Sequence, residues 1–150
     1  MAVILDGKKL RDKLLSDLKL KIDKSDTKPS LAVILVGNDP ASRIYVNNKK
    51  KNAEKLGIKS QVIEYPENVS ETEIIAKIQE LNNDTTVNAI LVQLPLPKHL
   101  NKQNIINAIY PLKDVDCFTM KITENWLRDR HLQFIPAPRK VFCFCLMNTE

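Results

Sequence analysis

The chain has 150 residues, of which 43% are apolar and 27% charged, and its 23 Lys and Arg against 18 Asp and Glu give a net charge of +5. This balance is typical of one soluble globular domain that can bury a core, and no apolar run approaches the roughly 20 residues that span a bilayer. The only glycines are Gly7, Gly37 and Gly57, so neither a G-x-G-x-x-G nor a G-x-x-x-x-G-K-[ST] phosphate-binding loop is present.

The cysteine content indicates the cellular compartment, and the net charge indicates which classes of binding partner to consider. Three cysteines, an odd number, argue against a disulfide framework and predict a reducing, cytoplasmic location. The short apolar amino terminus has no leading basic region, so we expect no signal peptide. A positive surface can attract nucleic acid or small polyanionic substrates. With only 5% aromatic residues to stack on bases, we expect neither a nucleic acid nor a membrane as partner.

The first two predicted elements are a helix and a strand. Apolar residues recur every four positions among charged ones, which indicates an amphipathic helix that begins near Asp6 and Gly7. Residues 31–36 form an uninterrupted apolar run closed by Gly37, typical of a strand buried on both faces in a parallel sheet. The apolar positions of the helix are Leu10, Leu14, Leu18 and Ile22.

A second helix and a second strand follow. Residues 38–40 form a turn that opens a helix over residues 41–56. Gly57 stands where a left-handed cap is expected. Residues 58–65 then predict a strand with partial alternation of apolar and polar positions.

The third helix and strand and a short fourth helix complete the regular part. Ser70 and Glu73 have the spacing of a capping box and begin the third helix. Residues 87–94 predict a strand that two prolines stop, and residues 101–110 predict a short helix. The apolar face of the third helix consists of Ile74, Ile75, Ile78 and Leu81.

This order, α-β-α-β-α-β-α, predicts an α/β fold in which a parallel sheet carries helices on both faces, a single three-layer domain. In such sheets, sites form where the carboxyl ends of the strands meet, which directs attention to residues 37–49 and 93–97. Nearer the carboxyl terminus the organisation weakens. We expect a turn or hairpin at 126–130, an extended segment at 136–138 and a short apolar tail at 141–147.

Five polar residues near these strand ends are candidates for chemistry. Tyr45 and Lys49 project from one face of the second helix, where a lysine can polarise a leaving group or act as a general base; a surface lysine beside a half-buried tyrosine is the simpler interpretation. Gln93 ends an apolar strand and needs partners, which a cleft or the strand end itself would supply. Asp114 and Asp116 are candidates for hydrogen bonds to a cationic or amide-rich ring. The alternative interpretation is a solvated turn.

The remaining reactive residues predict no metal site. Cys143 and Cys145 form a C-x-C pair without a second pair or a nearby histidine, whereas zinc normally takes four ligands. His99 and His131 have no carboxylate partner in sequence and receive no role. The lysines at 49–51 point in different directions on a helix, which indicates a solvated face rather than phosphate contacts.

Four motifs, in this order and at this spacing, resemble one family. They are VGNDPASRIYVNNK at 36–49, Gly57-Ile58, QLPLP at 93–97 and KDVD at 113–116. They resemble the bifunctional methylenetetrahydrofolate dehydrogenase/methenyltetrahydrofolate cyclohydrolase family, over residues 2–118 and again at 134–136. The resemblance implies an α/β domain that faces a Rossmann domain across a cleft, with folate in the cleft, NADP or NAD on the second domain, and no metal.

The resemblance also implies the reaction and the roles of individual residues. The family oxidises 5,10-methylenetetrahydrofolate to the methenyl form, which water opens to 10-formyltetrahydrofolate. Lys49 resembles the essential lysine of the cyclohydrolase step, and Gln93 resembles the glutamine that hydrogen-bonds to that lysine. The resemblance thus implies that Lys49, Gln93 and Asp116 are catalytic. Tyr45 resembles the tyrosine that packs on the folate rings, and Asp116 the aspartate that holds the pterin amides. The expected substrate-binding residues are Ser42, Tyr45, Leu94, Pro95 and Asp116.

Three departures from the family pattern bear on activity. Cys117 stands where the family has glycine, so a positive φ there would strain it and could displace Asp116. The family's P-x-T-P-x-G segment reads PAPRK at 136–140, and the sequence that follows does not resemble the family. A change of reading frame would produce both of these differences. The chain also ends where the cofactor domain would begin. We therefore expect a folate-binding catalytic domain over 1–118 and a divergent, partly irregular tail over 119–150.

Three hypotheses for function remain open. The first is the catalytic half of the folate enzyme, unable to carry out the dehydrogenase step alone, with cyclohydrolase activity to be tested. It would expose apolar surface that a homodimer or a full-length homologue could cover. The second is a non-catalytic folate-binding remnant, or a fragment that docks on such a homologue. The third is a small basic nucleic-acid-binding domain, which would show salt-dependent binding to duplex DNA.

Overall fold

The structure, a computed structural model, describes residues 6–120. Helices and strands alternate along these residues in the predicted order, and a 3-10 turn follows the last helix. The helices are α1 (Gly7–Asp23), α2 (Pro40–Leu56), α3 (Glu71–Asn83) and α4 (Lys102–Asn107), the strands are β1 (Ser30–Val36), β2 (Lys59–Tyr65) and β3 (Ala89–Val92), and the turn η1 is Pro111–Lys113.

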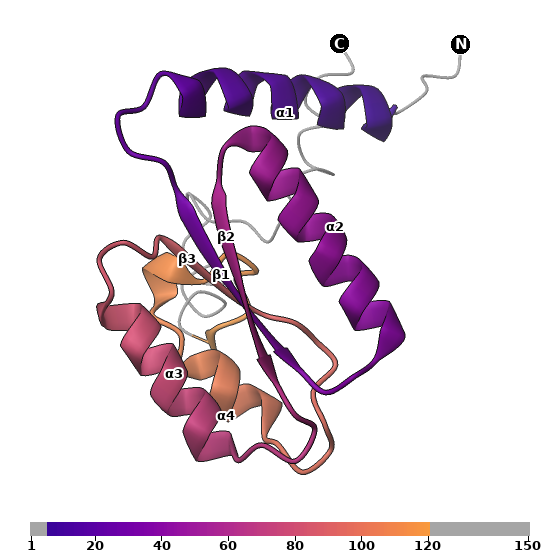
Figure 1. Ribbon diagram of the computed structural model, residues 1–150, viewed down its shortest axis with the longest axis vertical. Coiled ribbons are helices and arrows are strands. Elements are labelled where there is room, and N and C mark those ends of the chain that lie inside the picture. The colour runs from indigo at the N-terminus through magenta and orange to yellow at the C-terminus, as the bar shows by residue number, and fades with distance from the viewer. Residues whose placement is uncertain (1–5, 121–150) are drawn as a thin grey trace.

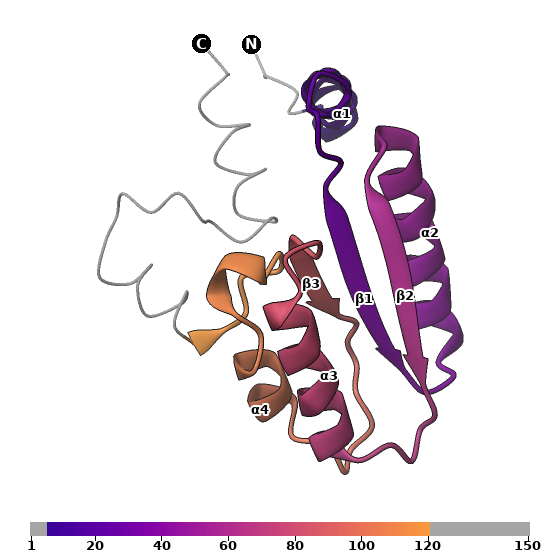
Figure 2. The ribbon, with the colours of Figure 1, turned by 60° about the vertical axis from the view of Figure 1, so that its left-hand side comes forward.

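The three strands form one parallel sheet in the order β2-β1-β3. Helix α2 lies on one face of the sheet, and α3 and α4 lie on the other, which confirms the predicted three layers (Figures 1 and 2). In the centre of the sheet, Ile34 of β1 lies opposite Ile63 of β2 and Val92 of β3. Because all strands run the same way, their carboxyl ends meet at one edge, where α2 also begins.

Strand β1 is buried on both faces, because successive side chains of a strand point to opposite sides of the sheet. Alternate residues therefore enter two separate cores, which explains why its sequence is an unbroken apolar run. The larger core, on the side of α3 and α4, contains Ala32, Ile34, Val36, Ile74, Ile78, Ile90 and Ile105; the smaller, on the side of α2, contains Val33, Leu35, Val46 and Leu91.

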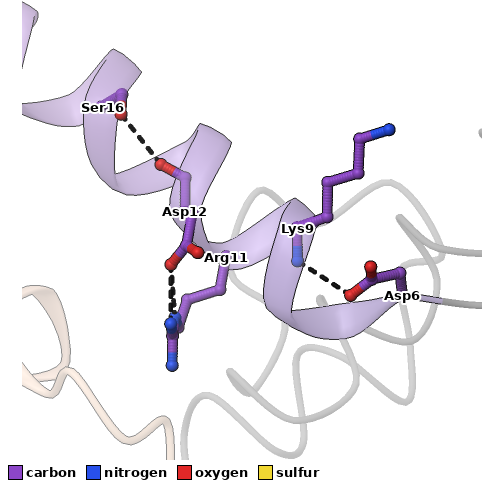
Figure 3. Close-up of polar contacts among 5 residues, drawn as sticks. All are labelled: Asp6, Lys9, Arg11, Asp12 and Ser16. Atoms are coloured by element: carbon purple, nitrogen blue, oxygen red, sulfur yellow. Dashed lines mark hydrogen bonds and ion pairs between the residues drawn. The ribbon is translucent and has the colours of Figure 1, made fainter.

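Polar side chains cap the starts of α1 and α3, and a glycine caps the end of α2, where the sequence indicates. Asp6 Oδ1 accepts a hydrogen bond from the Lys9 N–H at 2.9 Å at the start of α1 (Figure 3). Ser70 Oγ accepts one from the Glu73 N–H at 3.2 Å at the start of α3. Gly57 follows α2 with φ 81°, a conformation that is free of strain only without a Cβ. Each cap satisfies backbone groups that have no partner within the helix.

Helix α1 lies across the amino-terminal edge of the sheet and packs against α2 (Figures 1 and 2). Within it only Ile22 is buried, and its charged side chains form local contacts, such as the 2.7 Å ion pair between Arg11 and Asp12 (Figure 3). Across residues 6–120 no helix combines the length and the apolarity needed to cross a membrane. Four leucines of α1 are exposed: Leu14, Leu15, Leu18 and Leu20.

The third strand is shorter than predicted. The sequence predicts a strand over residues 87–94, but β3 spans only Ala89–Val92. The N–H of Val87 bonds to the Asp84 carbonyl at 3.2 Å, so Val87 belongs to the turn that enters the strand. At the other end, the ladder ends with the Gln93 N–H, because the prolines that follow cannot donate.

The fourth helix is also shorter than the predicted residues 101–110, and spans Lys102–Asn107. The Asn82 side chain of α3 donates to the Ala108 carbonyl at 2.8 Å and accepts from the Tyr110 N–H at 2.9 Å. These two bonds direct the chain out of the helix towards η1. The turn, extended segment and apolar tail expected near the carboxyl terminus lie outside the described residues.

Cys117 adopts the left-handed conformation, with φ 57°, and its side chain is buried. The condition under which the sequence predicts strain at this position, a positive φ, is therefore met. A Cβ at such a φ approaches the carbonyl oxygen too closely, which costs roughly 1–2 kcal/mol.

We expect Cys117→Gly to unfold with a free energy about 1 kcal/mol greater than Cys117→Ala, because only glycine removes the strain of the left-handed conformation. The alanine variant is the matched control, since it removes the same thiol and keeps the Cβ. Urea denaturation of both variants measures the difference. An alanine variant as stable as the glycine variant would show that the position is not strained.

Candidate functional site

Lys49 and Gln93 meet at the carboxyl edge of the sheet. The Lys49 Nζ donates a hydrogen bond to Gln93 Oε1 at 3.2 Å, although the two residues are 44 positions apart in sequence. Lys49 lies on α2, which packs on β1 through Val46, and Gln93 follows β3, held by its N–H bond to the Ile34 carbonyl at 2.9 Å. The parallel sheet therefore joins the two residues that the sequence singled out separately.

A second hydrogen bond fixes the Gln93 amide. Its Nε2 donates to the Leu94 carbonyl at 2.7 Å. A carboxamide that donates to one side presents its oxygen to the other. The acceptor oxygen of Gln93 therefore faces Lys49, which has only donors when it is charged.

Asp116 is the third member of this group, from the loop after η1. Removal from water raises the pKa of the Asp116 carboxyl above its usual value, the Lys49 ammonium opposes this shift, and the charge of Asp114 adds to it. The opposing effect of Lys49 places its charge within electrostatic reach of Asp116. The Lys49–Gln93 pair and a partly buried carboxyl that feels the Lys49 charge are groups that can hold a polar ring and move a proton.

Asp114 has a role that the sequence did not reveal. The D-x-D pair indicated either a ring-binding pair or a solvated turn, but Asp114 is only 5% exposed. Its carboxylate accepts hydrogen bonds from backbone N–H groups of the loop that follows. The signal available in the sequence is an aspartate at the start of a loop, a position typical of an aspartate that caps its own turn.

Tyr45 and Ser42 lie further along α2 towards its amino end. Tyr45 is one helical turn from Lys49 and 61% exposed, which leaves its ring open to a ligand. Ser42 is 3% exposed, and its N–H donates to Asp39 Oδ2 at 2.7 Å. Hydrogen bonds from the Ser42 hydroxyl and N–H hold the pKa of Asp39 below its usual value. Ser42 is therefore directed at the cap of its own helix.

Pro95 borders a hollow of about 400 Å³ between the ends of β1 and β3. Asp39 and Glu67 also line it, so it carries negative charge, and neither Lys49 nor Gln93 does. A larger hollow of about 870 Å³ lies at the opposite edge of the sheet, between Lys21 and Asn88. We place the site at the carboxyl edge despite this size difference, because that is where the interacting polar side chains converge.

The part of the chain that the structure describes contains no group of three or more His, Cys, Asp or Glu residues that could hold a metal ion. His99 Nε2 donates to the Val69 carbonyl, 3.0 Å away. Cys143, Cys145 and His131 lie outside the described residues.

The sequence matches a model of the tetrahydrofolate dehydrogenase/cyclohydrolase catalytic domain over residues 5–116. The bifunctional protein FolD of Ruminiclostridium cellulolyticum is 52% identical over 120 residues, which are 78% of this chain and 42% of that protein. The FolD protein of Aquifex aeolicus is 52% identical over 122 residues, covering 79% of this chain and 42% of its own length. The chain thus spans less than half the length of these curated relatives.

Solved structures agree in fold. The bifunctional FolD dehydrogenase/cyclohydrolase of Campylobacter jejuni superimposes with a TM-score of 0.91 at 39% identity, over 97% of this chain and 52% of that one. The enzyme of Trypanosoma brucei, solved with NADP cofactor and inhibitor, gives a TM-score of 0.87 at 27% identity, over 97% and 51% of the two chains.

We expect Asp116→Asn to raise the free energy of unfolding at pH 7. Burial raises the pKa of the Asp116 carboxyl in the folded chain, so the folded chain binds a proton at this carboxyl more tightly than the unfolded chain does. The folded chain therefore loses stability as the pH rises from the unfolded pKa of about 4 through the folded pKa. Asparagine removes that loss. Urea denaturation between pH 4 and pH 8 should show an advantage that shrinks on acidification; an advantage that grows on acidification would contradict the sign of the shift.

Proposed function

The chain belongs to the tetrahydrofolate dehydrogenase/cyclohydrolase family, and on that premise we propose that it binds a tetrahydrofolate and hydrolyses 5,10-methenyltetrahydrofolate to 10-formyltetrahydrofolate. The observation that carries the proposal is the 3.2 Å hydrogen bond between Lys49 and Gln93, with Asp116 within electrostatic reach of Lys49. One-carbon transfer between folates is the setting in which such a reaction operates. The chain aligns with 42% of the length of these FolD relatives.

The proposed step needs proton management more than a strong nucleophile. The methenyl carbon, bonded to N5 and N10 of the folate, is already electrophilic. Water adds its oxygen to this carbon and loses one proton, the bond from carbon to N5 breaks while N5 takes up a proton, and the added hydroxyl loses its proton to solvent as the carbon becomes the formyl group on N10. The Lys49 amine would receive the proton of the water and return one to the leaving nitrogen, and the Gln93 oxygen would hold the amine in place by one of its N–H bonds.

The other expected residues would bind the substrate. Asp116 would accept hydrogen bonds from the pterin ring, a suitable partner for a partly buried carboxyl that needs donors. The exposed Tyr45 ring would stack on the folate. Leu94 and Pro95 would line the same edge of the site. Ser42 would act indirectly, since it is buried and bonded to Asp39 at the start of α2.

A nicotinamide dinucleotide does not fit the described residues. Its diphosphate needs glycine-rich backbone or unoccupied N–H groups at a helix start. The turn between β1 and α2 is the corresponding place here, but Asp39 already accepts the Ser42 N–H there, and its lowered pKa keeps it negative. That charge would repel a diphosphate. The start of α2 therefore does not suit the diphosphate, and we propose that residues 6–120 supply the folate side of the family's chemistry.

We also propose a cytoplasmic setting and a folate-binding unit over residues 1–118, followed by the tail over 119–150. The buried thiol of Cys117 suits a reducing compartment. Four exposed leucines on α1 favour association, either as a homodimer or with a longer homologue. A basic surface suits the polyanionic tail of a folate as well as it suits nucleic acid.

We expect Lys49→Met to lower the rate of methenyltetrahydrofolate hydrolysis by the purified chain by 10²-fold or more, to the rate in buffer, since a positioned acid–base group contributes about 10²–10⁴-fold. Lys50→Met is the matched control: it removes the same charge from the exposed neighbouring position and should keep the wild-type rate. Chromatographic separation of substrate and product over time measures the rate of each protein.

The outcomes of that experiment separate the hypotheses. Equal rates for wild type, Lys49→Met and buffer would refute catalysis by this chain. Tetrahydrofolate binding without turnover would then support the folate-binding remnant. Neither binding nor turnover, together with salt-dependent binding to duplex DNA, would support the nucleic-acid hypothesis.

We expect no hydride transfer when the chain alone is given methylenetetrahydrofolate and NADP, because its described residues do not fit the diphosphate. The formation of NADPH is measured by its absorbance, with a full-length FolD protein as the positive control. NADPH formation above the rate without protein would contradict this prediction.

A further inference from the structure

One side chain organises the segment that carries Asp116. The Asp114 carboxylate, in a side chain that is 5% exposed, accepts three backbone N–H groups. Oδ1 accepts from Asp116 at 3.2 Å and Cys117 at 3.0 Å, and Oδ2 accepts from Thr119 at 2.8 Å. Hydrogen bonds to a charged acceptor are roughly twice as strong as neutral ones. Residues 116–119 are thus wrapped around a single buried carboxylate.

The backbone of Asp114 is itself fixed to the sheet. It pairs with Ile90 of β3 in a parallel bridge. The preceding residue, Lys113, donates through Nζ to the carbonyls of Leu81 at 2.8 Å and Asp84 at 2.7 Å, at the end of α3. These contacts give Asp114 a fixed position beside β3. Its carboxylate, through the three hydrogen bonds, then fixes the backbone of the loop that follows.

We propose that Asp114 is the positioning residue of the site, which holds Asp116 in place by organising the backbone of residues 116–119. The three hydrogen bonds also explain how Cys117 is kept at φ 57° despite its Cβ. The inference rests on the proposed function only for the ligand that Asp116 binds.

A positioning role leaves an electrostatic signature. The charged groups that act on Asp116 are Lys49, from α2, and Asp114, from its own loop, and Gln93 beside Lys49 is neutral. The charge of Asp114 contributes to the raised pKa of Asp116. Asparagine in place of Asp114 keeps the shape, removes this charge, and turns an NH₂ group towards one of the three donors.

The test compares Asp114→Asn with Asp6→Asn, an aspartate that caps the start of α1 by accepting the Lys9 N–H at 2.9 Å. Three quantities are measured by NMR and calorimetry: amide exchange of Thr119, the pKa of the Asp116 carboxyl, and tetrahydrofolate affinity. We expect Asp114→Asn to speed the exchange about tenfold or more, to lower the pKa, and to weaken binding about tenfold, as loss of one charge-assisted bond would. Asp6→Asn should leave all three unchanged.

Wild-type exchange at Thr119 and a wild-type pKa of Asp116 in folded Asp114→Asn would overturn the proposal. Failure of the wild-type chain to bind tetrahydrofolate would refute the proposed function, and the exchange and the pKa would still decide the role of Asp114. If Asp114→Asn does not fold, Asp114→Glu replaces it. Glutamate keeps the charge and moves the carboxylate by one methylene, so Thr119 exchange should still accelerate, and unchanged exchange would overturn the proposal.

Discussion

The hydrogen bond between Lys49 and Gln93 is the contact on which the site depends. It links α2 on one face of the sheet to the chain that leaves β3, so it exists only when the sheet has formed with the order β2-β1-β3. Val46 sets the position of α2 by packing against β1, and the Leu94 carbonyl sets the orientation of the Gln93 amide. The polar contact is therefore positioned by apolar packing on one side and by backbone on the other.

The site balances opposite charges across this contact. Burial and Asp114 favour the neutral form of the Asp116 carboxyl, whereas Lys49 favours its charged form. Burial and Lys49 therefore act in opposite directions on the carboxyl that we propose as the partner of the folate ring. The strain at Cys117 is located in the same loop, so the stability of the loop and the geometry of the site are determined together.

Much of this arrangement could be predicted from the sequence. The unbroken apolar run in β1 indicates a parallel sheet, and the position of sites at strand ends directs attention to Lys49 and Gln93. Long-range contacts are harder to predict: the Asn82 side chain ends α4 from another helix, and no local pattern contains that information. Asp114 was missed because a D-x-D pair has the same appearance whether its first carboxylate is solvated or buried beneath its own loop. Ser42 belongs to the recognised motif, but its burial against Asp39 depends on the helix start.

The most direct test of the central claim is an NMR titration of the chain with tetrahydrofolate that follows the Lys49 amine, the Gln93 amide and the Asp116 carboxyl. If the three side chains form one folate site, all three signals should move with a single dissociation constant, and signals around the hollow between Lys21 and Asn88 should stay in place. Shifts confined to that hollow, with the three side chains unchanged, would contradict the account.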